Sequence, residues 1–327
     1  MNRVLITTVP FADKNPLPLK LLEKAGIDYL INPIGRKLKE DELAEMVSDF
    51  DGLIAGTEPI TDKVMSHGKN LKLISRVGIG LDSVDLLAAE RRGIQVSYTP
   101  DAPAPAVAEL TVGMMLTLLR YVHVANSQMH QGLWHRYFGR RISEITIGII
   151  GVGRIGRGVI ERLASFKPAK ILINDITPEV EFSSMSWVQS AAKEEIYQQA
   201  DLISLHVPMT AQTKNMVQYN HLKAMKEDAI VINTSRGGII NEVDLARALN
   251  EGHLSAAAVD VFEQEPYDGE LRDIERCLLT SHMGSMSVDC RTRMEIEATE
   301  EAVRFLTGQS LEGAVPQEEY DVQRQGL

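Results

Sequence analysis

The segment ITIGIIGVGRIG, residues 145–156, is a short apolar run that ends in a glycine-rich turn. The residues that follow it, up to Leu163, have the apolar spacing of an amphipathic helix. A buried parallel strand, a tight turn and a helix are therefore predicted, an arrangement that binds the pyrophosphate of a dinucleotide. In this arrangement Gly151 allows the sharp turn, Gly153 lets the backbone approach the phosphates, and Gly156 lets the helix pack closely on the strand.

Glycine-rich turns occur in many loops, so the surrounding sequence has to support this interpretation. Asp175 ends the next predicted strand, about twenty residues after Gly156. A carboxylate there accepts hydrogen bonds from the adenosine ribose and would repel a 2′-phosphate, which favours NAD over NADP as the cofactor. The alternative is that Asp175 only closes the turn after its strand.

Length, charge and cysteine content limit the classes of protein to which this chain can belong. A chain of 327 residues is expected to form two domains, and a net charge of -11 spread along the sequence argues against nucleic acid or an anionic membrane as a partner. Cys277 and Cys290 have neither disulfide density nor metal-ligand spacing, which indicates a reducing compartment. The N-terminal apolar run is too short for a signal peptide, and no long apolar run follows. We therefore expect a cytoplasmic protein.

Apolar runs alternate with helical patterns along most of the chain, as in α/β proteins. In the first hundred residues the expected strands are 4–7, 29–31, 53–55, 73–75 and 94–96, and the expected helices are 17–25, 40–46 and 84–91. Three prolines within residues 99–105 predict a connection between domains. Residues 106–124 are apolar over a length that predicts one buried connecting helix.

The second half of the chain repeats the alternation around the glycine-rich turn. Further strands are expected at 171–174, 202–207, 230–233, 256–261 and 278–280, which gives a doubly wound Rossmann-type parallel sheet. A helix over residues 288–306 is expected to cross back to the first domain, and the last fifteen or so residues are expected to be irregular. The predicted domains are residues 101–287, which bind the dinucleotide, and residues 1–100 with 288–327, which bind the substrate.

Three polar residues stand at ends of predicted strands, where ligands collect on an open α/β sheet. Arg236, Glu265 and His282 form a chemical set, because a histidine exchanges a proton near neutral pH and a neighbouring carboxylate favours the imidazolium. An arginine can hold a substrate carboxylate by two parallel hydrogen bonds. Each residue alone also has a structural explanation, as a surface charge, a turn residue before Pro266 or a core histidine. His206 also ends a strand, where it could contact the cofactor.

Other kinds of catalytic site lack support in the sequence. No Cys or His cluster has zinc-ligand spacing, and neither a GxSxG nor a Walker sequence occurs. Metal-dependent hydrolysis, acyl transfer and nucleotide hydrolysis are therefore not expected, and no metal is assigned.

At the level of whole motifs, the chain resembles the D-isomer-specific 2-hydroxyacid dehydrogenases, and it is most similar to their phosphoglycerate dehydrogenase-like branch. The motifs follow the family's order from about Leu53 to Leu306. They are SRVGIGLD at 75–82, AELTVG at 108–113, GVGRIG at 151–156, LHVP at 205–208, NTSRGG at 233–238, VDVF with EP at 259–266, and SHMG at 281–284.

This resemblance implies a function for the chain and roles for its residues. The function is NAD-dependent hydride transfer between nicotinamide and C2 of a D-2-hydroxy or 2-keto acid. Arg236, Glu265 and His282 are implied to be catalytic, with Glu265 tuning His282 as the acid and base on the reacting oxygen. The implied cofactor-binding residues are Gly151, Gly153, Arg154, Ile155, Gly156, Asp175, His206, Pro208, Thr213, Thr234, Ser235, Asp260 and Gly284. Among these, Asp260 is implied to meet the nicotinamide carboxamide.

The resemblance also implies a discontinuous, flavodoxin-like substrate domain and a homodimer. Val77 and Gly78 are implied to offer backbone N–H groups to the substrate carboxylate, with Arg76 and Arg136 as further substrate ligands. The family's phosphate-binding arginine is missing, because residues 55–58 after the Gly-Leu-Ile strand read Ala-Gly-Thr-Glu. The substrate therefore stays open between 3-phosphoglycerate and hydroxypyruvate, glyoxylate or another 2-keto acid. An NAD(H)-sensing, corepressor-like interaction protein is the alternative from a different functional class.

Overall fold

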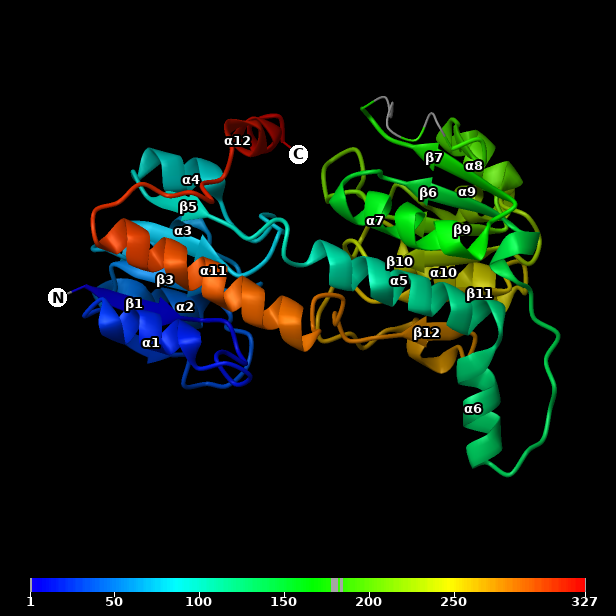
Figure 1. Cartoon of the computed structure of the whole chain (residues 1–327), viewed down its shortest axis with the longest axis horizontal. Coiled ribbons are helices and arrows are strands. Elements are labelled where there is room, and N and C mark those ends of the chain that lie inside the picture. Colours follow the sequence, from blue (N-terminus) through cyan, green and yellow to red (C-terminus); the bar gives the residue numbers. More distant parts are fainter. Residues whose placement is uncertain (1, 178–181, 183–184, 327) are drawn as a thin grey trace. The chain divides into compact units, whose positions relative to one another are not determined.

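The computed structural model describes residues 2–177, 182 and 185–326, which divide into two compact units (Figure 1). Unit 1 consists of Met1–Pro103 and Met286–Leu327, and unit 2 is Ala104–Ser285. These borders lie within three residues of those expected from the sequence. The roles assigned to the two units stay a prediction.

Unit 1 is built on a five-stranded parallel sheet with the strand order β2-β1-β3-β4-β5. This is the order of a flavodoxin-like sheet, in which the direction of winding reverses between β1 and β3. The strands are β1 (Arg3–Ile6), β2 (Asp28–Ile31), β3 (Gly52–Ala55), β4 (Leu73–Arg76) and β5 (Gln95–Ser97). The helices are α1 (Leu17–Lys24), α2 (Glu40–Met46), η1 (Val47–Asp49), α3 (Asp62–His67), α4 (Leu86–Arg91), α11 (Val288–Leu306) and α12 (Gln317–Arg324).

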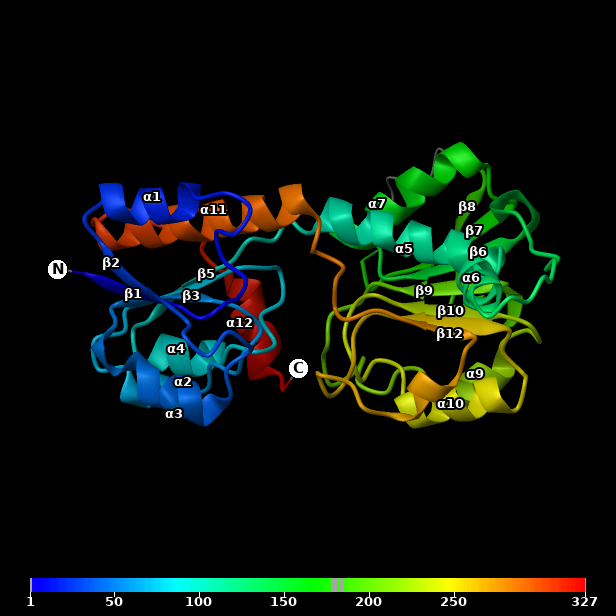
Figure 2. The same cartoon turned by 90° about the horizontal axis from the view of Figure 1, so that it is seen from below.

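Helices cover both faces of this sheet, which explains why its central strands β3 and β4 are buried along their whole length. Figure 2 shows α1 and α11 on one face and α2, α3 and α4 on the other. Helix α11 packs on β3 and β4, where the Ser75 hydroxyl donates to the carbonyl of Ala298 over 2.7 Å. A helix from the end of the chain therefore completes the core of the unit that the first hundred residues begin.

Unit 2 contains a seven-stranded parallel sheet with the order β12-β11-β10-β9-β6-β7-β8. Six of these strands follow the Rossmann order, whose reversal falls between β6 and β9. The strands are β6 (Thr146–Ile150), β7 (Lys170–Asn174), β8 (Val188–Ser190), β9 (Leu202–Leu205), β10 (Ile230–Asn233), β11 (Ala256–Val259) and β12 (Cys277–Leu279). The helices are α5 (Ala104–Leu119), α6 (Val122–His130), η2 (Ile142–Glu144), α7 (Arg154–Leu163), η3 (Ala164–Phe166), α8 (Lys193–Gln199), α9 (Tyr219–Ala224), α10 (Glu242–Asn250) and η5 (Glu270–Asp273).

The helices of unit 2 form one hydrophobic core on each face of the sheet. Helices α5 and α7 share a core with the strands on one side, and α8, α9 and α10 share the other. Figure 2 shows α5 and α7 opposite α9 and α10. The fold is thus the predicted pair of α/β units, one Rossmann-type and one flavodoxin-like.

The prediction of one helix over residues 106–124 was wrong, because two helices meet there at an angle of 64°. Tyr121 adopts a left-handed conformation with φ 55°, which ends the helical hydrogen-bond ladder. The carbonyl of Leu119 instead accepts the N–H of Arg140 over 3.0 Å. Only α5 is largely buried, whereas most of α6 is partly or fully exposed.

The expectation of an irregular C-terminus was also wrong, because α12 forms there. Tyr320 packs against the hydrophobic core of unit 1, and polar contacts also hold this helix in place. The Gln323 side chain accepts the N–H of Leu86 over 2.9 Å and donates to the carbonyl of Val84 over 2.8 Å. Arg324 adds an ion pair with Glu90 on α4.

Among the described residues, no single helix has the length and apolar character needed to cross a membrane. Helices α5 and α6 meet that test only when taken together as a bent pair.

Candidate active site

The glycine-rich turn between β6 and α7 has the geometry that its sequence predicts. Gly151 has φ 93°, and a Cβ there would lie 2.5 Å from the carbonyl oxygen of His206. A Cβ on Gly156 would lie 2.0 Å from the carbonyl oxygen of Gly151. By contrast, a Cβ on Gly153 would meet no atom within 4 Å. Two of the glycines are therefore required by packing, and the third borders open space where a phosphate can approach.

Asp175 ties the end of β7 to this turn. Its Oδ2 accepts the N–H of Val152 over 2.6 Å, and its Oδ1 accepts the N–H of Thr177 over 2.9 Å. The hydrogen bond from the N–H of Thr177 shows that Asp175 closes the turn after β7. The bond to Val152 places the carboxylate beside the glycine turn, which is also what the ribose-binding interpretation requires.

His206 follows β9, on the other side of the point where the winding of the sheet reverses. Its Nε2 lies 2.9 Å from the Ser204 hydroxyl, and within the described part of the chain its buried Nδ1 has no hydrogen-bond partner. Burial lowers the pKa of His206 to about 3, so the ring is neutral at physiological pH. A buried ring nitrogen beside the glycine turn is suited to a bound polar ligand.

Arg154 and Ile155 begin α7 directly after Gly153, which is the N-cap of the helix. Both residues retain exposed surface, so the N-terminal turn of α7 is accessible. The free N–H groups and the positive dipole of a helix N-terminus favour a phosphate there.

The strands β10, β11 and β12 are neighbours in the sheet, and each carries one member of the predicted catalytic set at its carboxyl end. His282 Nδ1 lies 2.9 Å from both carboxylate oxygens of Glu265. Both side chains are partly exposed, at 36% for His282 and 23% for Glu265. Because Nδ1 faces a carboxylate, it carries the proton, and Nε2 is the nitrogen that can act on a substrate.

Arg236 occupies the loop after β10, which packs against the loop that leads to Glu265. A Cβ on the neighbouring Gly237 would lie 1.9 Å from the carbonyl carbon of Phe262, so the two backbones touch. Arg236 Nη1 donates to the carbonyl of Ser235 over 2.7 Å, and its own carbonyl accepts from the Asn233 side chain over 2.8 Å. The loops after β10 and β11 are therefore held together by close backbone contact.

Asp260 anchors the loop that carries His282, a role that the sequence did not reveal. Its Oδ1 accepts from the Thr280 hydroxyl over 2.6 Å and from the N–H of Met283 over 2.9 Å, and its Oδ2 accepts from the N–H of Gly284 over 2.9 Å. Its carbonyl accepts the N–H of His282 over 2.8 Å. These bonds hold His282 at φ 51°, a conformation that non-glycine residues rarely adopt. The predicted contact with the carboxamide stays a prediction.

The remaining predicted cofactor residues line the same edge of the sheet and have internal partners. The Thr234 hydroxyl lies 2.9 Å from that of Thr111, and the Ser235 hydroxyl donates to the Asn233 side chain over 2.8 Å. The Thr213 hydroxyl donates to the carbonyl of Pro208 over 2.6 Å. These bonds position the loops, and contact with a cofactor stays a prediction for each residue.

The four predicted substrate ligands lie on different units. In unit 1, the N–H of Val77 donates to the carbonyl of Ala55 and that of Gly78 to the Thr99 hydroxyl, both over 2.8 Å. A carboxylate could use these N–H groups only by replacing those partners. Arg76 is buried and donates to the carbonyl of Val77 over 2.8 Å. Arg136 is exposed on the segment of unit 2 that follows α6.

Comparison with known families identifies the cofactor and the class of substrate for this site. The sequence profile of "D-isomer specific 2-hydroxyacid dehydrogenase, NAD binding domain" matches residues 112–284, which include the glycine turn, Asp175 and the three catalytic candidates. The chain belongs to this family. It is therefore an NAD-dependent oxidoreductase of CH–OH groups, which acts on a small 2-hydroxy or 2-keto acid.

Individual relatives agree with this assignment. The dehydrogenase is 34% identical to a hydroxypyruvate reductase from Thermotoga maritima over 87% of its own length and 96% of that protein. It is also 34% identical to a D-3-phosphoglycerate dehydrogenase from Methanocaldococcus jannaschii, but it spans only 59% of that longer chain. The solved structure of the TT0316 protein from Thermus thermophilus is 33% identical, with a TM-score of 0.87 over 96% of this chain and 100% of the other.

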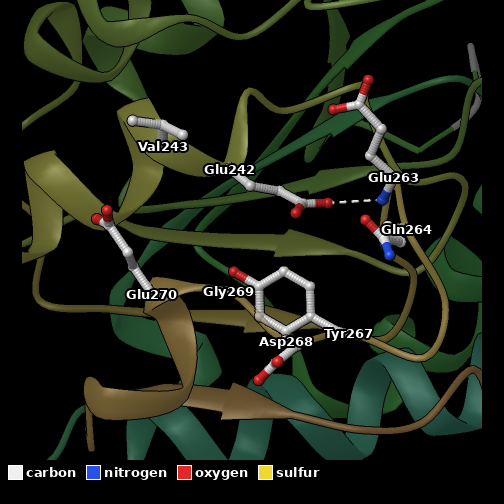
Figure 3. A pocket seen from close by; sticks show the side chains of 8 residues that line it. All are labelled: Glu242, Val243, Glu263, Gln264, Tyr267, Asp268, Gly269 and Glu270. Carbon is white, nitrogen blue, oxygen red and sulfur yellow. Dashed lines mark hydrogen bonds between the residues drawn. The ribbon is translucent and has the colours of Figure 1, made fainter.

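The dehydrogenase also has an acidic pocket of about 400 Å³ beside the Glu265 loop, which the sequence did not reveal. In Figure 3, Glu242 points toward the backbone nitrogen of Glu263, from which it accepts a 2.7 Å hydrogen bond. Burial raises the pKa of Glu242, and the nearby carboxylates of Glu263 and Glu265 raise it further. The pocket is lined by Glu242, Val243, Glu263, Gln264, Tyr267, Asp268, Gly269 and Glu270.

Proposed function

We propose that the dehydrogenase interconverts a small D-2-hydroxy acid and its 2-keto acid, with His282 as the group that gives and takes the proton. The observation that carries this proposal is the 2.9 Å pairing of His282 Nδ1 with Glu265 at the carboxyl edge of the Rossmann-type sheet. NAD, when bound, exchanges a hydride with the substrate carbon that bears the reacting oxygen. His282 Nε2 donates a proton to that oxygen during reduction and accepts it during oxidation.

Glu265 and Arg236 support this proton transfer in different ways. The Glu265 carboxylate stabilises the imidazolium that forms when His282 takes up the proton, because opposite charges in contact favour the ionised forms. Arg236 holds the carboxylate of the substrate, for which the planar guanidinium is well suited. Its hydrogen bond to the carbonyl of Ser235 fixes the direction of the side chain.

The experiment that tests the proposal is a panel of 2-keto acids, including glyoxylate, hydroxypyruvate and 3-phosphohydroxypyruvate, assayed for oxidation of NADH. Turnover of at least one acid, with the D-2-hydroxy acid as product, is the expected result. Tight binding of NADH without turnover of any acid would contradict the proposal. That outcome would favour an NAD(H)-sensing interaction protein.

We predict that Asp175→Asn lowers the ratio of kcat/KM with NADH to kcat/KM with NADPH by about tenfold or more. The change keeps an acceptor for the N–H of Val152 and removes the charge that repels a 2′-phosphate. The measurement is kcat/KM for each cofactor with one keto acid. Asp175→Ala, which also removes the acceptor, separates the effect of charge from that of the turn. An unchanged ratio in both variants would refute the ribose role.

We also propose that the dehydrogenase is a homodimer that pairs through α6 and the segment after it. This part of unit 2 carries large exposed apolar side chains, among them Trp134 at 78% and Phe138 at 100% exposure. Figure 1 shows α6 and this segment reaching away from the sheet of unit 2. Apolar surface of this kind is typical of interfaces, because burial against a second copy removes it from water.

The dimer is tested by Phe138→Asp, which we expect to shift the chain from dimer to monomer. A buried charge without a partner strongly opposes association. Analytical ultracentrifugation measures the change, and Phe166→Asp, at another partly exposed phenylalanine of unit 2, is the control. A monomeric wild type, or a dimer that persists in Phe138→Asp, would contradict the proposal.

Cellular location and the absence of nucleic-acid or membrane partners stay predictions. The two cysteines are buried, and burial raises the pKa of the Cys277 thiol to about 12, which suits inert thiols in a reducing compartment.

A further inference from the structure

Glu242 is the first residue of α10, and the start of this helix is well anchored. The Asn241 side chain caps the helix by accepting the N–H of Asp244 over 3.0 Å. The N–H of Asn241 donates to the carbonyl of Val217 over 2.9 Å. Apolar residues farther along α10 are buried in the core of unit 2. The Glu242 side chain therefore projects from a rigid base.

The carboxylate of Glu242 holds the backbone of the loop that leads to Glu265. Its Oε1 accepts the N–H of Glu263 over 2.7 Å, as Figure 3 shows. The side chains of Glu263, Asp268 and Glu270, which line the same pocket, are exposed. Because a pocket of about 400 Å³ lies beside the loop, side chains do not fill the space there. The hydrogen bond to Glu242 therefore supplies a restraint that packing on this side does not.

The peptide that Glu242 holds is the point where two loops meet. A Cβ on Gly237 would lie 1.9 Å from the carbonyl carbon of Phe262 and 2.3 Å from the nitrogen of Glu263. Gly237 directly follows Arg236, so the Phe262–Glu263 peptide touches the loop that carries the arginine. A shift of this peptide would disturb both loops.

Phe262 connects the same peptide to the proposed proton-transfer pair. Its N–H donates to Glu265 Oε1 over 3.2 Å, and this oxygen lies 2.9 Å from His282 Nδ1. Its ring stacks on that of Tyr267, with the ring centroids 4.3 Å apart. A short series of hydrogen bonds therefore runs from Glu242, through the backbone of Phe262, to Glu265 and His282.

We propose that Glu242 is a positioning residue for proton transfer, which holds the Phe262–Glu263 peptide so that the Glu265 carboxylate faces His282 Nδ1. The inference rests on the proposed function and adds to it a residue that acts through Glu265. Without the acceptor, the N–H of Glu263 turns toward water in the pocket, and the loop loses its fixed position. A small displacement of a catalytic group is enough to slow a reaction strongly.

The test compares Glu242→Ala with Glu242→Gln. Alanine removes the acceptor, whereas glutamine keeps one for the N–H of Glu263 and removes only the charge. Glu242→Ala is expected to lower kcat about tenfold, with NADH affinity within about twofold of the wild type. Glu242→Gln is expected to keep kcat within about twofold of the wild type. Glu270→Ala, at an exposed carboxylate of the same pocket, is the control and should leave kcat unchanged.

Nitrogen NMR of protein labelled at histidine gives a second readout that does not require turnover. The shifts of the two ring nitrogens report which of them carries the proton, and His282→Ala identifies the signals of His282. The wild type and Glu242→Gln are expected to hold the neutral ring with its proton on Nδ1, facing Glu265. Glu242→Ala is expected to move the proton toward Nε2, because the carboxylate no longer holds it at Nδ1.

The outcomes separate this inference from the proposed function. Wild-type kcat in Glu242→Ala, or an equal loss of kcat in both variants, would refute the positioning role of Glu242 alone. A loss of kcat matched by an equal loss of NADH affinity would refute it too, since it indicates a general structural effect. If the wild type reduces no 2-keto acid, the proposed function fails, and the NMR comparison decides the role of Glu242. An unchanged ring proton in Glu242→Ala would then overturn the inference.

Discussion

His282→Ala is expected to lower kcat by about 100-fold or more, the range typical of a lost general acid and base. Binding of NADH is expected to change by only a few-fold. The reason is that the loop around residue 282 is held by its backbone, since Asp260 accepts the N–H groups of Met283 and Gly284. Removing the imidazole therefore leaves the loop and the glycine turn in place. Steady-state kinetics with NADH fluorescence titration measures both quantities.

A matched control for this variant is His67→Ala, which removes an exposed histidine from α3 in unit 1. It should leave both kcat and NADH affinity unchanged. Wild-type turnover in His282→Ala would remove the proton-transfer role from this residue. An equal loss of NADH binding and turnover would instead show that the side chain supports the cofactor site.

Gly156→Ala and Gly153→Ala are expected to differ in their effect on stability, although each adds one methyl group to the same turn. In Gly156→Ala the methyl would lie 2.0 Å from the carbonyl oxygen of Gly151, so α7 has to move away from β6. Overpacking of this kind costs about 1–3 kcal/mol, sometimes more. The expected result is a lower unfolding temperature together with loss of NADH binding.

In Gly153→Ala the methyl enters open space, so the unfolding temperature should stay near that of the wild type. NADH affinity should still fall, about tenfold, because the methyl projects where the pyrophosphate approaches. Differential scanning calorimetry and fluorescence titration distinguish the two variants. Wild-type affinity in Gly153→Ala would place the pyrophosphate elsewhere.

The glycine turn and the three strand ends could be predicted because their signals are local. The Gly-rich turn follows an apolar strand directly, and Arg236, Glu265 and His282 each follow a recognisable strand. Adjacent parallel strands end at one edge of a sheet, so residues far apart in sequence meet there. The sequence thus indicated that Glu265 and His282 lie together before their 2.9 Å contact was known.

Other features depend on tertiary contacts that no local pattern records. The break between α5 and α6 requires Tyr121 in a left-handed conformation, and tyrosine has no special preference for it. Strand β8, which was not predicted, has only three residues and no long apolar run. Glu58 is held in its buried position by a hydrogen bond from the hydroxyl of Thr7, which lies about fifty residues earlier in the chain.

The discontinuity of unit 1 affects the order in which the chain can fold during synthesis. Unit 2 is one continuous segment, so all of its strands have been synthesised before Val288 is added. Unit 1 lacks α11 until then, and one face of β3 and β4 has no permanent cover. Because domains tend to fold as units while they emerge, the Rossmann-type unit can be complete before the flavodoxin-like unit. A nascent chain stalled before residue 288 would therefore expose an apolar sheet face, which is a typical target for chaperones.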